Sequence, residues 1–126
     1  MSTLENLDPK ELRYFTGSEN WTRWTRIKPN AGLTDGALYV AKGGGAYWLM
    51  DIIASVQNLQ GIKGEYFQNW ILTVNQDKSA LVTCDDGNGN LLYKQEIEFT
   101  DFPLDKIQLY AVDDGQSLTI MLPGEY

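Results

Sequence analysis

The pattern of hydrophobic residues changes its period near residue 65, and this change constrains the fold more than any other feature. Before it, apolar residues recur at the spacing of one helix face: Leu49, Ile52, Ile53, Val56 and Leu59. After it, short segments rich in β-branched and aromatic residues indicate strands over 66–74, 79–84, 91–99, 106–112 and 117–122. Helices followed by strands predict an α+β fold.

The segment 91–99 has the clearest strand pattern. One face is apolar and carries Leu91, Tyr93, Ile97 and Phe99, whereas the other is charged and carries Lys94, Glu96 and Glu98. Turn residues fill the short connections 75–78, 85–90 and 113–115, and short connections join neighbouring antiparallel strands. We therefore predict one domain over 1–126, an antiparallel meander of about five strands with N-terminal helices packed on one face.

Capping residues locate the expected helices. Asp8 and Pro9 are typical of the N-cap and first position of a short helix that runs through Phe15. Thr34 is the expected cap of a second helix over 35–42. The glycines at 43–45 end that helix, and a third helix follows over 46–59 as the centre of the core.

Composition excludes several classes of chemistry. The 126 residues include no histidine and one cysteine, Cys84. A Ser-His-Asp triad, a Cys-His dyad and histidine-ligated zinc are therefore excluded, as is an internal disulfide. We assign no catalytic residue, metal ligand or cofactor. The N-terminus lacks the pattern of a signal peptide and no apolar run is long enough to cross a membrane, so we expect a cytoplasmic protein without membrane contact.

Two glycine-rich motifs each allow both a structural and a functional interpretation. The glycines 43–45 lack the Lys-Ser/Thr of a phosphate loop, so a helix–helix hinge is favoured over an anion site. The run 85–90 lacks the glycine and glutamate of a calcium loop, so a tight turn is favoured over a weak cation contact. Asp51 interrupts the apolar helix and aligns with Tyr47 and Ser55, which predicts an exposed polar stripe.

Negative charge concentrates in the last third of the chain. The formal net charge is −7, and residues 77–126 alone carry ten acids and three lysines. Such a surface repels phosphate backbones, so direct binding of duplex nucleic acid is not expected. The expected partner is a protein with a basic surface. The candidate contacts are Asp85, Asp86, Glu96, Glu98, Asp101, Asp105, Asp113 and Asp114.

The segment 20–28 mixes tryptophans with arginines. Its composition predicts a strand at an edge of the sheet, with one of Trp21 and Trp24 in the core and the other over an arginine. The same residue types occur at protein hot spots and at single-stranded nucleic-acid sites. A second candidate contact patch therefore consists of Arg23, Trp24 and Arg26.

Four segments are similar to a family of small uncharacterised proteins found in bacteria, plasmids and phages. They are LRYFTGSENW at 12–21, GGAYWLMD at 44–51, TCDDGNGN at 83–90 and FTDFPL at 99–104. The resemblance extends over nearly the whole chain and transfers no catalytic residue. It implies a role in the biology of mobile elements, where small acidic proteins include inhibitors of host defence such as anti-CRISPR and anti-restriction proteins.

These observations favour a non-enzymatic, acidic protein-binding module that inhibits a nucleic-acid-handling protein of a host. An alternative is a small enzyme or a ligand- or cation-binding protein that uses carboxylates, which a deep pocket lined by Asp51, Tyr47 and tryptophans would support. A third hypothesis is a homo-oligomeric structural protein joined through the edge or face of its sheet.

Overall fold

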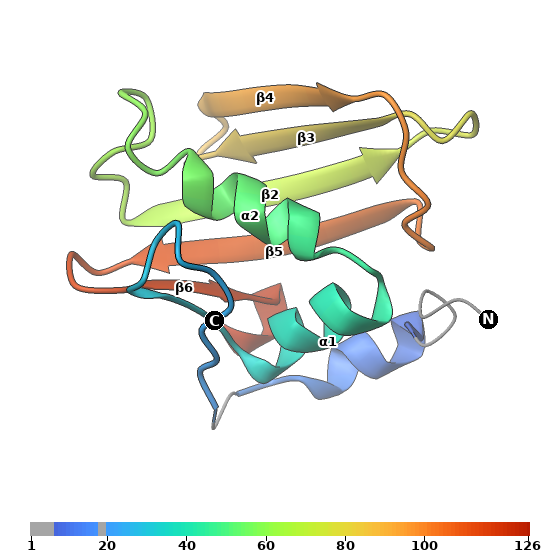
Figure 1. Ribbon diagram of the computed structural model, residues 1–126, viewed down its shortest axis with the longest axis horizontal. Helices are drawn as coiled ribbons and strands as arrows, with labels where there is room; N and C mark the ends of the chain where they lie inside the picture. The colour runs from blue at the N-terminus through green and yellow to red at the C-terminus, as the bar shows by residue number, and fades with distance from the viewer. Residues whose placement is uncertain (1–6, 18–19) are drawn as a thin grey trace.

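The computed structural model describes residues 7–17 and 20–126. Its centre is a six-stranded sheet with the order β1-β6-β5-β2-β3-β4 (Figure 1). All neighbouring strands are antiparallel except the parallel pair β1–β6. The strands are β1 Ala31–Leu33, β2 Phe67–Val74, β3 Ala80–Asp85, β4 Leu91–Ile97, β5 Lys106–Asp113 and β6 Leu118–Met121. The helices are η2 Pro9–Tyr14, α1 Asp35–Gly43, α2 Tyr47–Ser55 and η3 Pro123–Glu125. The predicted α+β class is confirmed.

The predicted five-strand meander is wrong in its connectivity. Strands β2, β3 and β4 form a meander, but β5 returns to pair with the opposite side of β2. The connection 98–105 passes the ends of β3 and β2 (Figure 1), where Thr100 N donates to Lys78 O at 2.8 Å and Val74 N donates to Asp105 O at 2.7 Å. Phe102 on this connection is only 2% exposed. Burial of this ring holds the connection against the core, so that β5 pairs with the side of β2 opposite β3.

The strand predicted over 20–28 is also wrong. Within it, only Thr22 forms an isolated antiparallel bridge, with Leu33. The short buried strand β1 follows Pro29 and Asn30, where no strand was predicted. Backbone hydrogen bonds with β6 hold β1 in the sheet. Leu118 N donates to Asn30 O at 2.9 Å, and Thr34 N donates to Ile120 O at 3.1 Å.

The helix predicted over 46–59 is shorter in the structure, where α2 ends at Ser55. Side chains bind its last carbonyls: Ser55 Oγ donates to Ile52 O at 2.9 Å, and Gln57 Nε2 donates to Ile53 O at 2.8 Å. Leu59 therefore lies outside the helix and is exposed. Such side-chain bonds to the backbone compete with the helical ladder, which explains the early end.

The predicted caps are confirmed. Thr34 Oγ1 accepts a hydrogen bond from Ala37 N at 3.2 Å at the start of α1. The side chain of Asp8 accepts from Lys10 N at 2.9 Å, although the helix that it caps is a 3-10 helix. Between α1 and α2 only Gly45 has the left-handed φ, +61°, that favours glycine.

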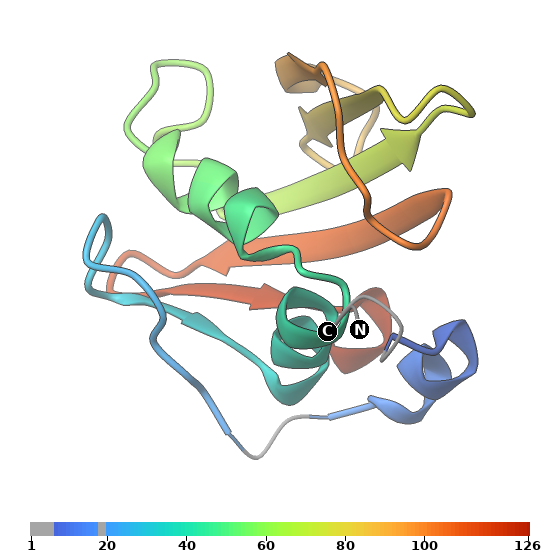
Figure 2. The ribbon, with the colours of Figure 1, turned by 45° about the vertical axis from the view of Figure 1, so that its right-hand side comes forward.

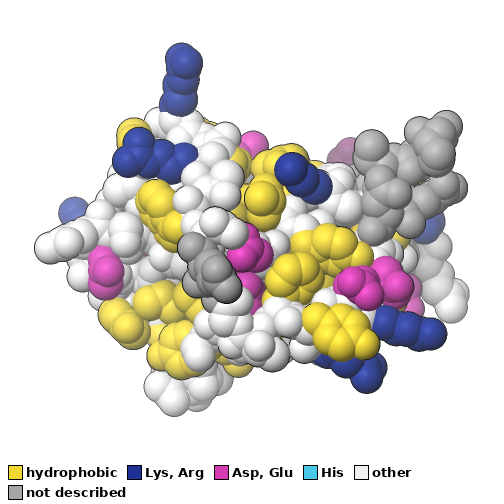
Figure 3. All heavy atoms as spheres, turned by 90° about the horizontal axis from the view of Figure 1, so that it is seen from below, with side chains coloured by type: hydrophobic (Ala, Val, Ile, Leu, Met, Phe, Trp, Pro, Cys, Tyr) yellow, Lys and Arg dark blue, Asp and Glu magenta, His cyan; other side chains and the backbone are white. Residues whose placement is uncertain are grey.

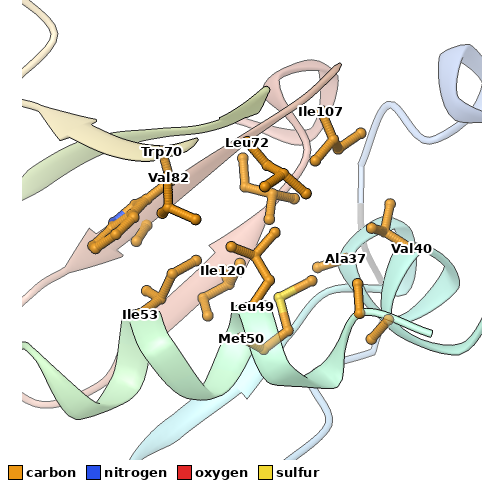
Figure 4. Packing of buried hydrophobic residues seen from close by; sticks show 14 of the residues in the cluster. Ala37, Val40, Leu49, Met50, Ile53, Trp70, Leu72, Val82, Ile107 and Ile120 are labelled. Atoms are coloured by element: carbon orange, nitrogen blue, oxygen red, sulfur yellow. The ribbon is translucent and has the colours of Figure 1, made fainter. Parts of the chain in front are cut away.

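The core lies between the sheet and the two α helices, which cover the same face of it (Figure 2). Leu49 and Ile53 of α2 point towards the strands that carry Trp70 and Val82 (Figure 4). The inner strand residues follow the alternation of a half-buried sheet, since Trp70 and Leu72 are both buried and Ile71 between them is less so. Among the described residues, no helix has the length and apolar character that a membrane span requires.

Candidate functional site

The structure divides the eight acidic candidate residues between the two ends of the sheet. Asp85 ends β3 and Asp86 follows it, and Asp113 ends β5 and Asp114 follows it, at the end of the sheet where β2 begins (Figure 1). The other four lie near the end where β2 finishes: Glu96, Glu98, Asp101 and Asp105. Antiparallel strands cause this division, because successive connections lie at alternate ends of the sheet.

The first pair of aspartates is built into the β3–β4 connection. Asp85 Oδ1 accepts from Gly87 N at 2.7 Å. Asp86 Oδ1 accepts from Asn88 N at 2.8 Å, and Asp86 Oδ2 accepts from the side-chain amide of Asn90 at 2.8 Å. The hydrogen bond from the Asn90 side chain, followed by that from the Asn88 backbone, lowers the pKa of Asp86. This carboxylate therefore stays charged at neutral and mildly acidic pH.

The second pair occupies the β5–β6 connection in the same way. Asp113 Oδ1 accepts from Gly115 N at 2.9 Å. Asp114 Oδ1 accepts from Ser117 N at 2.8 Å and from Gln116 N at 2.9 Å. These backbone hydrogen bonds, that of Ser117 first, lower the pKa of Asp114. Both connections thus hold negative charge in fixed positions.

The two pairs lie at the same end of the sheet but are staggered. Asn69 of β2 pairs with Asp85 on one side and with Tyr110 on the other, so Asp113 lies two strand spacings, about 10 Å, to the side of Asp85 and three residues, about 10 Å, further along. Their separation of about 14 Å exceeds the screening length of about 8 Å at physiological ionic strength, so each pair presents a separate negative charge. Exposed apolar side chains adjoin them: Leu91 pairs with Asp85, and Tyr66 O accepts from Asp113 N at 2.8 Å. We define the turn-end surface as Tyr66, Asp85, Asp86, Leu91, Asp113 and Asp114.

The negative charges of this end also act on the interior. Cys84 is buried near the end of β3. Burial, followed by the charges of Asp85, Glu65 and Asp86, raises the pKa of its thiol to about 12. The thiolate is therefore disfavoured, and this cysteine is a poor nucleophile in the folded chain.

The opposite end of the sheet has a mixed character. A hollow of about 340 Å³ lies there, with Glu96 and Glu98 in its lining beside Lys94. Asp101 and Asp105 lie on the connection that follows, and both are exposed. The eight acids therefore do not form one continuous negative face. The surface seen from below, over β1, β6 and α1, likewise mixes charges of both signs with hydrophobic side chains (Figure 3).

The structure brings the second candidate patch together. Arg23, Trp24 and Arg26 line one pocket of about 340 Å³, with Thr25 and Pro29. Both arginines are exposed, and within residues 7–17 and 20–126 neither forms an ion pair. We call this the arginine–tryptophan pocket.

The two tryptophans differ from the expected core-and-arginine arrangement. Trp24 is half-buried, and its Nε1 donates to Asp51 Oδ1 on α2 at 2.9 Å. Trp21 is 41% exposed, and its Nε1 donates to Thr119 Oγ1 at 3.1 Å. Its ring covers Gly32, where a Cβ would lie 2.1 Å from the indole. Asp51 is thus a half-buried positioning partner of Trp24, whereas Tyr47 and Ser55 of the predicted polar stripe are exposed.

Sequence reasoning missed a row of side chains on the sheet face opposite the α helices. The rings of Phe67, Tyr110 and Tyr126 pack together, with centroids 4.7–5.6 Å apart. Beside them, Gln108 Nε2 donates to Asn69 Oδ1 at 2.8 Å, and Asn69 Nδ2 donates to Asp85 Oδ2 at 3.1 Å. The row therefore orients one carboxylate of the turn-end surface. Only the register of β2 with β3 and β5 reveals it.

A search of the described residues for a metal centre gives a negative result. No three of their histidine, cysteine, aspartate and glutamate side chains are grouped so that they could hold a metal ion. The one aspartate that the sequence placed within an apolar helix, Asp51, bonds to an indole instead.

Comparison with known proteins identifies the fold and the family. No curated protein matches the sequence. The fold is similar to the crystal structure of a protein of unknown function from Enterococcus faecalis, with a TM-score of 0.54 and 21% identity over 82% of this chain and 98% of that one. A family model, described as a family of unknown function (DUF6876), matches residues 6–126. The chain therefore belongs to the family of unknown function DUF6876, as the similarity of its segments to a family of uncharacterised proteins indicated.

Proposed function

We propose that this chain is a non-enzymatic protein-binding module that presents its turn-end surface to a partner with a basic surface. The observation that carries the proposal is that four aspartates lie on two hydrogen-bonded connections at one end of the sheet. Within the described part of the chain none of the four forms an ion pair, so their charge is available to a partner. Tyr66 and Leu91 add apolar area that a partner can cover.

The chemistry of the surface suggests the class of partner. Two carboxylate pairs about 14 Å apart can contact lysines and arginines that would otherwise contact phosphates along a nucleic acid. A partner that handles nucleic acid has such residues, and occupation of them would block its substrate. We therefore propose an inhibitory role towards a nucleic-acid-handling protein, of the kind that mobile elements direct against host defence.

The arginine–tryptophan pocket supplies a second contact of opposite charge. It includes Pro29, and the next residue, Asn30, donates from Nδ2 to Gln116 O at 2.7 Å in the β5–β6 connection. The pocket therefore adjoins the turn-end surface on the β1 side. A partner that touches both would need a basic area with an acidic or aromatic group beside it, which sets its orientation.

The test is quantitative binding to a partner captured from host lysate. Asp86→Asn with Asp114→Asn removes two charges and keeps one side-chain oxygen in each turn to accept the backbone N–H groups, although Asp86 loses the bond from the Asn90 side chain to its second oxygen. The association rate should fall roughly tenfold at low salt, with a weaker dependence on salt than the unmodified chain shows. The matched control is Glu98→Gln with Asp101→Asn, which removes two charges from the other end and should leave the rate nearly unchanged. Equal effects of the two double variants, or an association rate independent of salt, would refute the proposal.

A further inference from the structure

Strand β4 leaves a long edge of the sheet unpaired. It is seven residues long and ends the strand order, and none of the described residues pairs with its outer side (Figure 1). The other edge is protected: β1 has three buried residues, and its outer side exchanges two backbone hydrogen bonds with Thr22, at 2.8 and 2.9 Å. Only β4 therefore offers a template for a further strand.

The hairpin between β2 and β3 determines which residues of β4 point outward. Asn75 N donates to Ser79 O at 2.8 Å, so the pair 75–79 is hydrogen-bonded. Because hydrogen-bonding direction alternates along a strand, the backbone N–H and C=O groups of Ala80 and Val82 point towards β4. They pair there with the backbone groups of Ile97 and Gln95. The even-numbered residues of β4, among them Lys94 and Glu96, consequently point their N–H and C=O groups to the free edge.

We propose that two copies of this chain pair antiparallel through β4, about a two-fold axis at Gln95. This register places Lys94 of each copy opposite Glu96 of the other. The free N–H and C=O groups of these residues can then form hydrogen bonds between the two copies. Two opposite-charge pairs then flank the axis. Neighbouring registers centred on Lys94 or Glu96 satisfy the backbone equally well but place a like-charged residue opposite itself. The charges therefore select one register.

Exposed apolar residues lie at both ends of the pairing segment. Leu91 begins β4 and is 61% exposed, and Phe99, two residues beyond its end, is 67% exposed. The two-fold relation that matches Lys94 with Glu96 brings the Leu91 end of one copy near the Phe99 end of the other, although a bulge between Tyr93 and Leu91 interrupts the regular ladder, so the pairing rests on residues 93–97. The alternating charges make this edge complementary to itself about the two-fold axis. The partner that fits it is a second copy of the chain.

The first experiment measures association of the full chain by light scattering over a range of concentrations. The unmodified chain should show a monomer–dimer equilibrium. Lys94→Glu alone, or Glu96→Lys alone, should raise the dissociation constant about tenfold or more, because like charges then face each other twice. An equimolar mixture of these two variants should recover the dimer, since an acidic edge then faces a basic one. Lys106→Glu, with the same charge change on interior strand β5, is the matched control.

The second experiment tests the register. Gln95 and its symmetry mate form a pair without hydrogen bonds, in which the Cα atoms lie about 4.5 Å apart, within disulfide reach. Gln95→Cys should therefore give a linked dimer on mild oxidation, and Thr73→Cys, exposed on interior strand β2, should not. A monomer at every concentration, a mixture that fails to associate, or equal cross-linking of both cysteine variants would overturn the proposal. Circular dichroism confirms that each variant is folded.

Discussion

A buried amide pair joins the end of α2 to β2, and it gives a sharp prediction about stability. Gln57 Nε2 donates to Gln68 Oε1 at 2.9 Å, and Gln68 Nε2 donates to Gln57 Oε1 at 2.8 Å. Trp70 Nε1 also donates to Gln68 Oε1, at 3.0 Å. Both glutamines are buried. Gln68 is therefore the hydrogen-bond partner of two other buried side chains, Gln57 and Trp70.

Gln68→Leu keeps the volume of the side chain and removes its hydrogen bonds. Trp70 Nε1 and Gln57 Oε1 then lose the hydrogen bonds that they make with Gln68. At about 1–3 kcal/mol for each unsatisfied buried group, the loss of stability should be about 2–6 kcal/mol. Gln57→Leu should cost less, about 1–2 kcal/mol, because Gln68 Oε1 keeps Trp70 and Gln68 Nε2 keeps Glu65 O at 3.3 Å.

The double variant distinguishes this reasoning from a simple loss of packing. With both glutamines replaced, Gln57 Oε1 no longer exists as an unsatisfied group. The combined loss should therefore be smaller than the sum of the two single losses. Urea unfolding, followed by tryptophan fluorescence and circular dichroism, measures all three variants. Additive losses, or a Gln68→Leu variant as stable as the unmodified chain, would show that the amide network has no such role.

Three further predictions follow from single sites. Gly32→Ala should lower stability by about 1–3 kcal/mol, since its Cβ would overlap the Trp21 ring; thermal unfolding should show this, and a Trp21→Ala background should remove most of the loss. Cys84 should resist iodoacetamide at pH 8 in the folded chain and react in urea, because burial raises its pKa to about 12; mass spectrometry that finds rapid alkylation of the folded chain would contradict this. Hydrogen bonds lower the pKa values of Asp86 and Asp114 below the ordinary 3.8. Their contribution to stability should be complete above the unfolded pKa and be lost as pH falls through the lowered folded pKa. Acid unfolding of Asp86→Asn and Asp114→Asn variants should accordingly depend less on pH in that range.

Local rules predicted the features that depend on neighbours in sequence. The Thr34 cap of α1, the glycine break after it and the alternation of apolar residues in the strands all follow from backbone geometry within a few residues. The division of the acids could have been predicted as well. Once the strands after residue 65 are read as antiparallel, the connections at 85–90 and 113–117 must lie at one end of the sheet.

Long-range burial decided the rest. Residues 100–105 carry no strand pattern, yet burial of Phe102 there allows β5 to pair with the side of β2 opposite β3. The end of α2 depends on Gln57, whose partner Gln68 lies eleven residues away. The position of the Trp24 ring depends on a distant residue, because its Nε1 donates a hydrogen bond to Asp51.

The sequence by itself determined the class of the fold, the positions of most strands, the caps and the excess of negative charge. Only the tertiary structure decided the strand order, the buried amide pair, the arginine–tryptophan pocket and the free edge of β4. The physical reason is that periodicity and capping are set by groups a few bonds apart. Strand order and sites depend instead on which distant side chains exclude water together, and no local pattern contains that information.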